Sequence, residues 1–443
     1  MTDVVFHHNP KKLPEFSDEC HPVQLYDKFK WNSLSSSCIA RPVIEKIRDL
    51  GCSVSVESFD FLTIAMAVTA ADTFVQRDNS PNAWARELNL QIPLCRPDKW
   101  NDVSARLEKA LGFLTGDMWS LIFTTGGLAP PKIKTSKKAA EKRRTLKGLD
   151  CVCLFSGGLD SAVGAIDIIN GGDRRPLLVS HAYKGDATKQ NQVEKVLTQG
   201  QYSRLSFNAD PHLINRLEGK TDITMRGRSF NFLAMAVVGV SAIQRVNGSP
   251  AGEIIIPENG YISLNPPLSR RRIGSLSTRT THPYFLTQIV DLLNIVGFDI
   301  SITNPYHYKT KGEMLKECKD ETSLKKALSH TVSCSNWHRK GIQCGRCVPC
   351  VIRRSAVHAA GLSNDANYDS EKLQNELKSG DSKDDILALA AAHIKLQKMK
   401  DPSRWVRESG PLPDAKNERD PLVDVFRRGL NEVGIFFKKE KVL

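Results

Sequence analysis

The sequence predicts an α/β protein in which a parallel sheet is preceded by a small α/β domain and followed by a helical segment. Three observations support this prediction. Between residues 149 and 302, short apolar strands alternate with stretches of helical periodicity, which is typical of a parallel sheet covered by helices on both faces. A glycine-rich loop, LFSGGLDSA, follows the first strand at 154–162. Four cysteines between 334 and 350 predict a structural zinc element.

Residues 1–127 are predicted to form the small N-terminal α/β domain, a candidate partner-binding unit. Residues 1–50 are irregular and dotted with proline, and they predict no particular element. Further along, the predicted elements are a helix from about residue 57, a strand within 85–95, a helix within 98–117 and a strand at 118–124. Apolar residues at helical spacing place Phe61, Ile64, Ala65, Val68 and Ala71 on one face of the first helix. Alternation places Leu88, Leu90 and Ile92 on one side of the first strand.

A Pro-Pro and Lys-rich segment, 128–148, is predicted to be a basic linker. It carries part of the formal net charge of +13, which favours a polyanionic partner such as a nucleotide, RNA or an acidic protein surface. A basic tract of this kind is either a solvated linker or a binding patch.

Residues 149–365 are predicted to form the main domain and 366–443 a helical C-terminal extension. The predicted strands are 150–155, 176–182, 203–207, 253–257 and 298–303, and the predicted helices between them are 161–169, 187–198, 228–246 and 283–296. In the extension, 383–400 and 420–437 read as amphipathic helices, with Asp420 and Pro421 at the cap and first turn of the second. We expect these helices to pack on the core or on a partner.

Compartment and membrane association are predicted from apolar runs and cysteines. The longest apolar run, 230–243, is bounded by Arg228 and Arg245 and is shorter than a membrane span. The first residues lack the layout of a signal peptide. The eleven cysteines are odd in number and unevenly placed, which argues against a disulfide framework. We therefore expect a cytoplasmic protein with no membrane partner.

The loop after the first strand of the main domain has the chemistry of an anion site. A helix N-terminus attracts phosphate through its free N–H groups and its dipole. Gly157 and Gly158 allow a close backbone approach, and Ser156 and Ser161 supply hydroxyl donors. Asp160 would repel phosphate, so it orients the loop or helps to hold Mg²⁺. The loop lacks the lysine of a Walker motif, and the alternative interpretation is a strand-to-helix turn with a serine cap.

Cys334, Cys344, Cys347 and Cys350 have the spacing C-x9-C-x2-C-x2-C. Four thiolates suit a tetrahedral zinc ion, and a site filled by four protein ligands is structural. The alternatives are a redox pair and an iron–sulfur cluster. His338 is a spare residue near the cluster, facing the surface or an anion.

The loop sequence SGGLDS resembles the SGGxDS signature of the PP-loop ATP pyrophosphatases, the adenine nucleotide α-hydrolase-like superfamily. This resemblance implies a Rossmann-like sheet and cleavage of ATP to AMP and pyrophosphate. It also implies which residues bind the nucleotide. The pyrophosphate would contact Ser156, Gly157, Gly158, Leu159, Asp160 and Ser161, and adenine would contact Ser180 and His181 at the end of the second strand.

Region 149–362 as a whole resembles 7-cyano-7-deazaguanine synthase, the QueC family. Besides the loop and the cysteines, the stretches RGRSFNFLAMA (226–236) and YKTKGEML (308–315) carry this resemblance. It implies an ATP-dependent C–N ligase that uses ATP, Mg²⁺ and Zn²⁺ and adenylates the carboxylate of a 7-deazaguanine. The implied catalytic residues are Asp160, Ser161, Arg228 and Lys311, with surface solvation as the alternative role for the two cations.

Other features depart from the synthase. The stretch 257–285 is rich in arginine, and its pocket-forming candidates are Glu258, Asn259, Arg279, Thr280 and His282. The longer chain, with 113–119 and 264–285, resembles the QueC-like proteins of bacterial anti-phage Qat operons. That resemblance implies protein partners from the same operon and a protein amine in place of ammonia. Two other hypotheses stay open: a tRNA-modifying enzyme of the thiolation type and a non-catalytic nucleotide-binding subunit.

Overall fold

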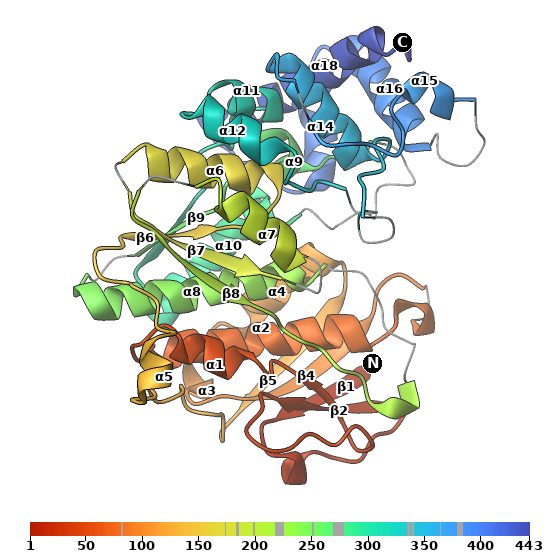
Figure 1. Ribbon diagram of the computed structural model, residues 1–443. Coiled ribbons are helices and arrows are strands. Elements are labelled where there is room, and N and C mark those ends of the chain that lie inside the picture. The colour runs from red at the N-terminus through yellow and green to blue at the C-terminus, as the bar shows by residue number, and fades with distance from the viewer. Residues whose placement is uncertain are drawn as a thin grey trace.

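The computed structural model describes residues 1–80, 83–172, 174–182, 186–197, 200–217, 226–249, 252–268, 279–334, 337, 341–363, 365–378 and 384–443. Among these residues it contains two five-stranded sheets, both parallel throughout. Together with the helical C-terminal stretch, the two sheets confirm the predicted α/β class. Figure 1 shows the N-terminal sheet at the bottom, the second sheet above it and the C-terminal helices at the top.

The second sheet has the strand order β10-β9-β6-β7-β8. Its strands are β6 (Cys151–Leu154), β7 (Pro176–His181), β8 (Ser203–Phe207), β9 (Gly252–Ile255) and β10 (Ile300–Thr303). All five predicted strands are therefore present, within a few residues of their predicted bounds. The central strands β6 and β7 are buried along their whole length, because helices cover both faces of the sheet.

The crossover helices of this sheet are α6 (Leu159–Asn170), α7 (Asp186–Glu194), α8 (Arg228–Asn247) and α10 (Pro283–Val296). They correspond to the four predicted helices. α6 and α8 lie on opposite sides of the sheet (Figure 1). Among the described residues one stretch, Ser229–Asn247, is long and apolar enough to cross a membrane, but 72% of it is buried inside the protein. Helix α8 extends beyond the apolar run 230–243 at both ends, and it belongs to the protein core.

The N-terminal sheet has the order β3-β2-β1-β4-β5. Its strands are β1 (Thr2–His7), β2 (Cys20–Leu25), β3 (Ser37–Ile39), β4 (Glu87–Pro93) and β5 (Met118–Thr124). Three of these strands and helix α1 (Val43–Arg48) lie within 1–50, where the sequence predicted no element. Short strands joined by irregular, proline-containing loops carry too little periodicity to be seen in the sequence. The burial of Leu88, Leu90 and Ile92 on one face of β4 is confirmed.

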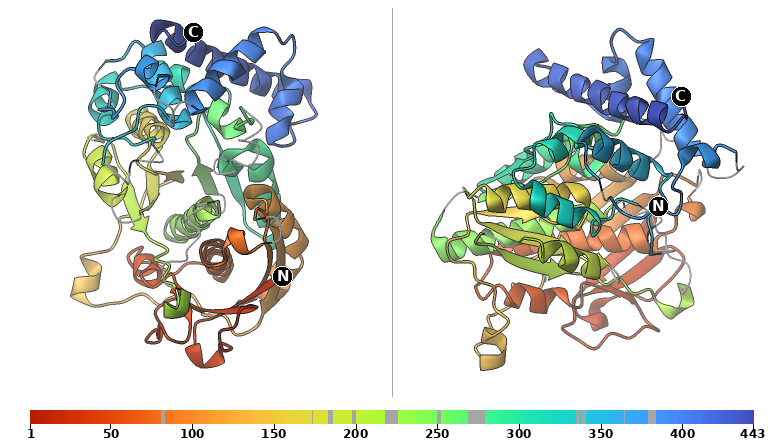
Figure 2. Two further views of the ribbon diagram at one scale, coloured as in Figure 1. Left: turned by 90° about the vertical axis from the view of Figure 1, so that its right-hand side faces the viewer. Right: turned by 45° about the horizontal axis from the view of Figure 1, so that its top comes forward.

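Helix α2 (Val56–Phe74) was expected to bury one face, but it is buried on all sides. It packs on the N-terminal sheet and also along α8 of the second sheet. Phe61 of α2, for example, lies edge-on to Phe230 of α8, with ring centroids 5.3 Å apart. The left view of Figure 2 shows both helices between the two sheets. One continuous hydrophobic core therefore runs through both sheets.

The two sheets are related in topology as well as in contact. Counted from the first strand, both have the order 3-2-1-4-5. α2 and α8 each follow the third strand of their own sheet, and they pack together. α4 (Ser104–Thr115) and α10 each follow the fourth strand, and they also pack together. Equivalent helices thus meet in pairs at the junction of the two sheets.

The C-terminal part packs beyond α6. Its helices are α11 (Lys311–Lys316), α12 (Glu321–Leu328), α14 (Val348–Ala359), α15 (Leu373–Glu376), α16 (Asp384–Gln397), α17 (Ser403–Val406) and α18 (Lys416–Lys439). α18 packs against α14, α16 and α9 (Gly260–Leu264) around a core of its own. It begins before Asp420 and contains Pro421 in its interior, contrary to the predicted cap. A proline near the N-terminus of a helix removes one hydrogen bond but does not prevent helical residues before it.

The remaining short helices are α3 (Pro97–Asn101) and, within the predicted linker, α5 (Lys137–Ala140).

Candidate active site

The SGGLDS loop lies at the carboxyl end of β6, at the point where the strand order reverses. The chain leaves β6 toward β7 on one side and returns to β9 on the other. Open parallel sheets bind ligands at such a reversal, beyond the carboxyl ends of the strands. The loops after β6 and after β9 flank this position, so the topology brings residues 156–161 beside residues 256–260.

The loop backbone requires its first glycine. Gly157 has φ +80°, and a Cβ there would lie 2.8 Å from Cγ of Gln190. Gly158 is the N-cap of α6, so the free N–H groups of the first turn open at the loop. Ser156 is exposed, and its Oγ accepts a hydrogen bond from the Gly158 N–H at 3.3 Å. Ser161 Oγ donates to the Gly158 carbonyl at 2.9 Å. The loop is therefore braced internally, and the first turn of α6 has backbone N–H groups without partners inside the helix.

Leu159 and Asp160 follow as the first residues of α6. The Leu159 side chain is 1% exposed and belongs to the core beside β6, so only its backbone is placed to meet a ligand. Asp160 is 6% exposed and forms an ion pair with the Lys311 ammonium. Its other carboxylate oxygen accepts a hydrogen bond from Asn259 Nδ2 at 2.7 Å. The structure thus brings together Asp160 and Lys311, which are 151 residues apart in the sequence.

A second carboxyl group, that of Glu258, adjoins Asp160. Burial opposes ionisation of Asp160, but the Lys311 charge and the hydrogen bonds from Glu258, Lys311 and Asn259 outweigh burial and hold the pKa of Asp160 well below its usual range. Burial and the Asp160 carboxylate raise the pKa of Glu258 well above its usual value. The environment therefore favours the protonated form of Glu258, which can donate a hydrogen bond to the Asp160 carboxylate. Carboxylate oxygens at the edge of a phosphate-binding loop have the chemistry to hold Mg²⁺.

Ser180 and His181 end strand β7 next to the loop, and both are buried. Ser180 Oγ accepts a hydrogen bond from Arg204 Nε at 3.0 Å, and His181 packs edge-on against Phe207. Gln190 donates to the carbonyls of Ser156 and His181, at 3.1 Å and 2.9 Å, and so ties the loop to β7.

Sequence reasoning missed Gln190 and Arg204. Arg204 also binds the side chains of Gln190, Asn191 and Glu194. The signal for Arg204 was a lone cation inside the apolar strand SRLSF at 203–207, because a buried charge requires partners.

Arg228 is the first residue of α8, and its side chain lies outside the described residues. The residues just before it are fixed by the N-terminal domain. Arg226 donates to the Thr115 carbonyl at 2.8 Å and lies over the ring of Trp84. The Gly227 N–H donates to the Asp72 carboxylate at 2.7 Å. The N-terminal domain therefore sets where α8 begins.

The four predicted cysteine ligands come together in one cluster. Sγ atoms of Cys334, Cys344, Cys347 and Cys350 lie within 4.8 Å of one another, and all four residues are buried. Sγ of Cys344 is 3.9 Å from that of Cys350, and Sγ of Cys347 is 4.0 Å from that of Cys334. Thiolates about 2.3 Å from a tetrahedral zinc ion lie about 3.8 Å apart. The cluster can hold zinc, whereas His338 lies outside the described residues.

The cysteine cluster adjoins the SGGLDS loop through a short segment, 328–334. Arg353 of α14 is fully buried and donates to the carbonyls of Leu328 and Thr331, at 2.6 Å and 3.0 Å. The Val332 N–H donates to the Gly157 carbonyl at 3.4 Å. Because Cys334 follows Val332 by two residues, the cluster anchors a segment that touches the loop.

Residues 281–361 match the family model described as Queuosine biosynthesis protein QueC. No curated protein and no solved structure matches the chain. The matched region contains Lys311 and all four cysteines, whereas the SGGLDS loop precedes it. The match supports a QueC-like, ATP-using enzyme family of the ATP pyrophosphatase type.

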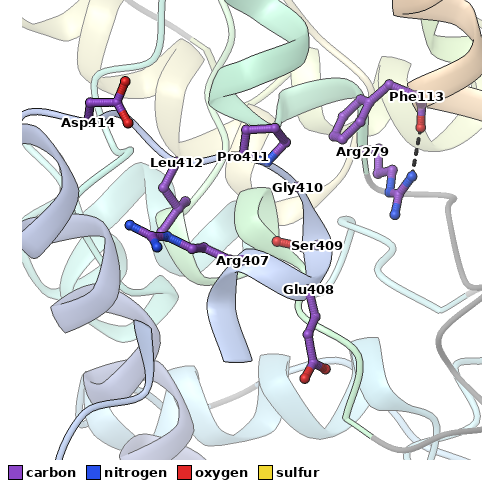
Figure 3. Close-up of a pocket in the computed structure, with 9 residues that line it drawn as sticks. All are labelled: Phe113, Arg279, Arg407, Glu408, Ser409, Gly410, Pro411, Leu412 and Asp414. Carbon is purple, nitrogen blue, oxygen red and sulfur yellow. Dashed lines mark hydrogen bonds between the residues drawn. The ribbon is translucent and has the colours of Figure 1, made fainter. Parts of the chain in front are cut away.

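The QueC match begins just after Arg279 and Thr280, and the structure separates the pocket-forming candidates. Glu258 and Asn259 adjoin Asp160, whereas Arg279 lines a different cavity of about 540 Å³ (Figure 3). Arg279 donates to the Phe113 carbonyl at 2.8 Å and stacks on the Phe113 ring. His282, the N-cap of α10, is fully buried against Phe113. Thr280 Oγ1 donates to Ser229 Oγ. The remaining lining of this cavity comes from residues 407–412 and Asp414.

Proposed function

We propose that the protein uses ATP to adenylate a carboxylate of the 7-deazaguanine type and releases AMP and pyrophosphate. One observation supports this most directly. Lys311, inside the QueC-matched region, forms an ion pair with Asp160 of the SGGLDS loop, which lies outside that region. Two features that separately resemble one enzyme family therefore meet at a single site.

The reaction needs anions to be brought together. A carboxylate oxygen attacks the α-phosphorus of ATP, a new O–P bond forms, and the bond to the β-phosphate oxygen breaks as pyrophosphate leaves. Backbone N–H groups of the SGGLDS loop and the hydroxyls of Ser156 and Ser161 would bind the leaving pyrophosphate. Lys311 would screen the charge that gathers between the two reactants, with Arg228 as a second candidate. Asp160, together with Glu258 once it has released its proton, would hold Mg²⁺, which supplies further charge neutralisation when bound.

The acceptor is the second part of the proposal. Ammonia would displace AMP to give an amide, and dehydration with a second ATP would give the nitrile, as the synthase resemblance implies. An amine of a partner protein from the same operon would instead give a tagged protein in anti-phage defence. The N-terminal domain and the altered stretch 257–285 distinguish the chain from the synthase, and they favour the protein amine.

The first experiment measures AMP and pyrophosphate from ATP, Mg²⁺ and 7-carboxy-7-deazaguanine, with and without ammonia. Ser161→Ala and Asp160→Ala should abolish AMP formation. Asp299→Ala is a suitable control, because Asp299 is exposed and precedes the edge strand β10, at the amino ends of the parallel strands and away from the loop. Nitrile, amide or a mass gain on a partner chain would identify the acceptor. AMP formation that survives in both loop variants would refute the proposal.

A second candidate function is tRNA modification of the thiolation type. The net charge of +13 and the exposed lysines 132, 134, 137 and 138 of the linker favour a polyanionic partner. Binding driven by phosphate contacts weakens steeply as salt rises. A gel shift with bulk tRNA would detect such binding. The salt should be varied from roughly 50 to 200 mM, the range over which phosphate contacts lose most of their affinity. Nucleotide binding without AMP formation would instead indicate the third hypothesis, a non-catalytic subunit.

A further inference from the structure

We propose that Glu432 of the C-terminal helix α18 is a positioning residue of this site: it holds the first turn of α11 so that Lys311 faces Asp160. The inference rests on the function proposed above for Lys311, and it assigns part of the ATP site to the C-terminal extension. Glu432 lies on a segment that follows the QueC-matched residues 281–361.

The Glu432 carboxylate binds the residues on both sides of Lys311. One of its oxygens accepts a hydrogen bond from the Thr310 hydroxyl, and the other accepts from the Gly312 N–H at 3.3 Å. A Cβ on Gly312 would lie 2.5 Å from this carboxylate. Glycine at 312 therefore permits the close approach of α18 to α11.

A neighbouring residue of α18 strengthens the same contact. Arg428, one turn before Glu432, forms an ion pair with Glu313 and donates to the Tyr308 carbonyl at 2.8 Å. Glu313 in turn accepts a hydrogen bond from the Thr310 N–H at 2.9 Å, which completes a capping box at the start of α11. Side chains of α18 thus bind the cap, the third residue and the preceding loop of α11.

α11 needs this external support. It has six residues, and a helix that short is not stable by itself. Lys311 is its first residue and is 8% exposed, with its ammonium against Asp160. A shift of α11 by about 1 Å would misplace that ammonium, and displacements of this size cost on the order of 10²-fold in rate. Glu432 does not reach Asp160 itself, so its role is to position Lys311.

Two readouts test this role on Glu432→Gln and Glu432→Asp in the full-length protein. The first is the rate at which the Lys311 amine is modified by reductive methylation, measured by mass spectrometry. The second is kcat and KM for AMP formation. Glu418→Gln is the matched control, because Glu418 is an exposed glutamate in the first turn of the same helix.

Glu432→Gln should raise the Lys311 modification rate roughly 10-fold, as loss of one to two hydrogen bonds shifts a local opening equilibrium. Its kcat should fall by a similar factor, with KM for ATP changed less than about 3-fold, because misplacement removes an interaction of the transition state. Glu432→Asp, which keeps both carboxyl oxygens as hydrogen-bond acceptors, should recover part of both effects.

Unchanged Lys311 reactivity in both Glu432 variants, or an equal effect in Glu418→Gln, would overturn the inference. The lysine readout does not depend on turnover. If the parent protein forms no AMP under any condition, the proposed function fails, and the lysine reactivity still decides whether Glu432 positions Lys311.

Discussion

At the scale of single residues, the ion pair between Lys311 and Asp160 decides the electrostatics of the site. Lys311→Met would leave the carboxyls of Asp160 and Glu258 adjacent to each other without the cation that stabilises the charged form. We expect AMP formation to fall by roughly 10²–10³-fold, the usual effect of removing a preorganised charge from a transition state. Single-turnover measurements would check this prediction. A loss under about 5-fold would assign Lys311 a structural role.

The conformation of Gly157 gives a second prediction at this scale. Gly157→Ala would force a side chain into φ +80° and place its Cβ 2.8 Å from Gln190. Left-handed backbone costs an ordinary residue about 1–2 kcal/mol, and the contact adds to that cost. The loop should therefore shift and bind ATP at least about 10-fold more weakly, as measured by calorimetry. Gly126→Ala is a control, because it also has a positive φ but open space around it.

The sequence predicted the loop residues and the cysteines because each set is contiguous or regularly spaced. It did not reveal that Glu258 adjoins Asp160, or that Gln190 braces the loop and is itself held by Arg204. Asn259, next to Glu258, is 99 residues from Asp160, and Gln190 is 34 residues from Ser156, so only the folded sheet brings these residues together.

At the scale of elements, the cysteine cluster should contain zinc and support the SGGLDS loop. We expect about one zinc ion per chain by elemental analysis, the stoichiometry of a four-cysteine site. Cys347→Ser should abolish zinc binding, lower the melting temperature and weaken ATP binding, because Val332 connects the cluster to Gly157. Cys52→Ser, at a half-buried cysteine outside the cluster, should retain the metal. Absence of zinc together with visible absorbance would favour an iron–sulfur cluster.

The contact between α18 and α11 predicts a pH dependence of stability. Burial, aided by Glu313, raises the pKa of Glu432 to about 7, against the opposing effects of Thr310, Gly312 and Arg428. The folded protein therefore keeps a proton that the unfolded chain releases near its ordinary value of 4.5. Between these two values the folded state binds more protons, so the contribution of Glu432 to the free energy of unfolding falls as pH rises.

Melting temperatures of the parent and Glu432→Gln between about pH 4 and pH 8 would test this sign, because that range brackets the window between the two pKa values. The difference, parent minus variant, should decrease with pH and level off above about 7. A difference that increases with pH would contradict the prediction, since it would mean that the charged carboxylate stabilises the fold.

Individual elements were predictable where periodicity is strong. The five strands of the second sheet lie close to their predicted bounds, because buried parallel strands appear in a sequence as short apolar runs. Helix α10 also has its predicted bounds. The strands β1 to β3 were not predictable, since they are short and are joined by irregular, proline-containing loops that leave little periodicity in the sequence. The position of α18 against α11 depends on single side chains such as Glu432, which carry no pattern.

At the scale of the whole molecule, the sequence suggested separate domains, and the structure has one core shared between two sheets of the same strand order. The clue was present in α2, whose sequence VESFDFLTIAMAVTAADTF is apolar around most of its circumference. A helix of this kind is buried on all sides, so it must lie between two layers and cannot cover one alone.

This shared core predicts that residues 149–443 will not fold without the N-terminal domain. Removing it would expose the face of α8 that packs on α2, including Phe230, and would leave Gly227 without its Asp72 partner. An exposed apolar face of that size promotes aggregation. We expect the truncated chain to be insoluble alone and soluble when coexpressed with 1–148, and the full chain to unfold in one calorimetric transition across both sheets. A soluble, monomeric 149–443 with a cooperative transition and unchanged ATP binding would show that the two sheets are independent, and the N-terminal sheet would then be an accessory unit and not part of the scaffold of the site.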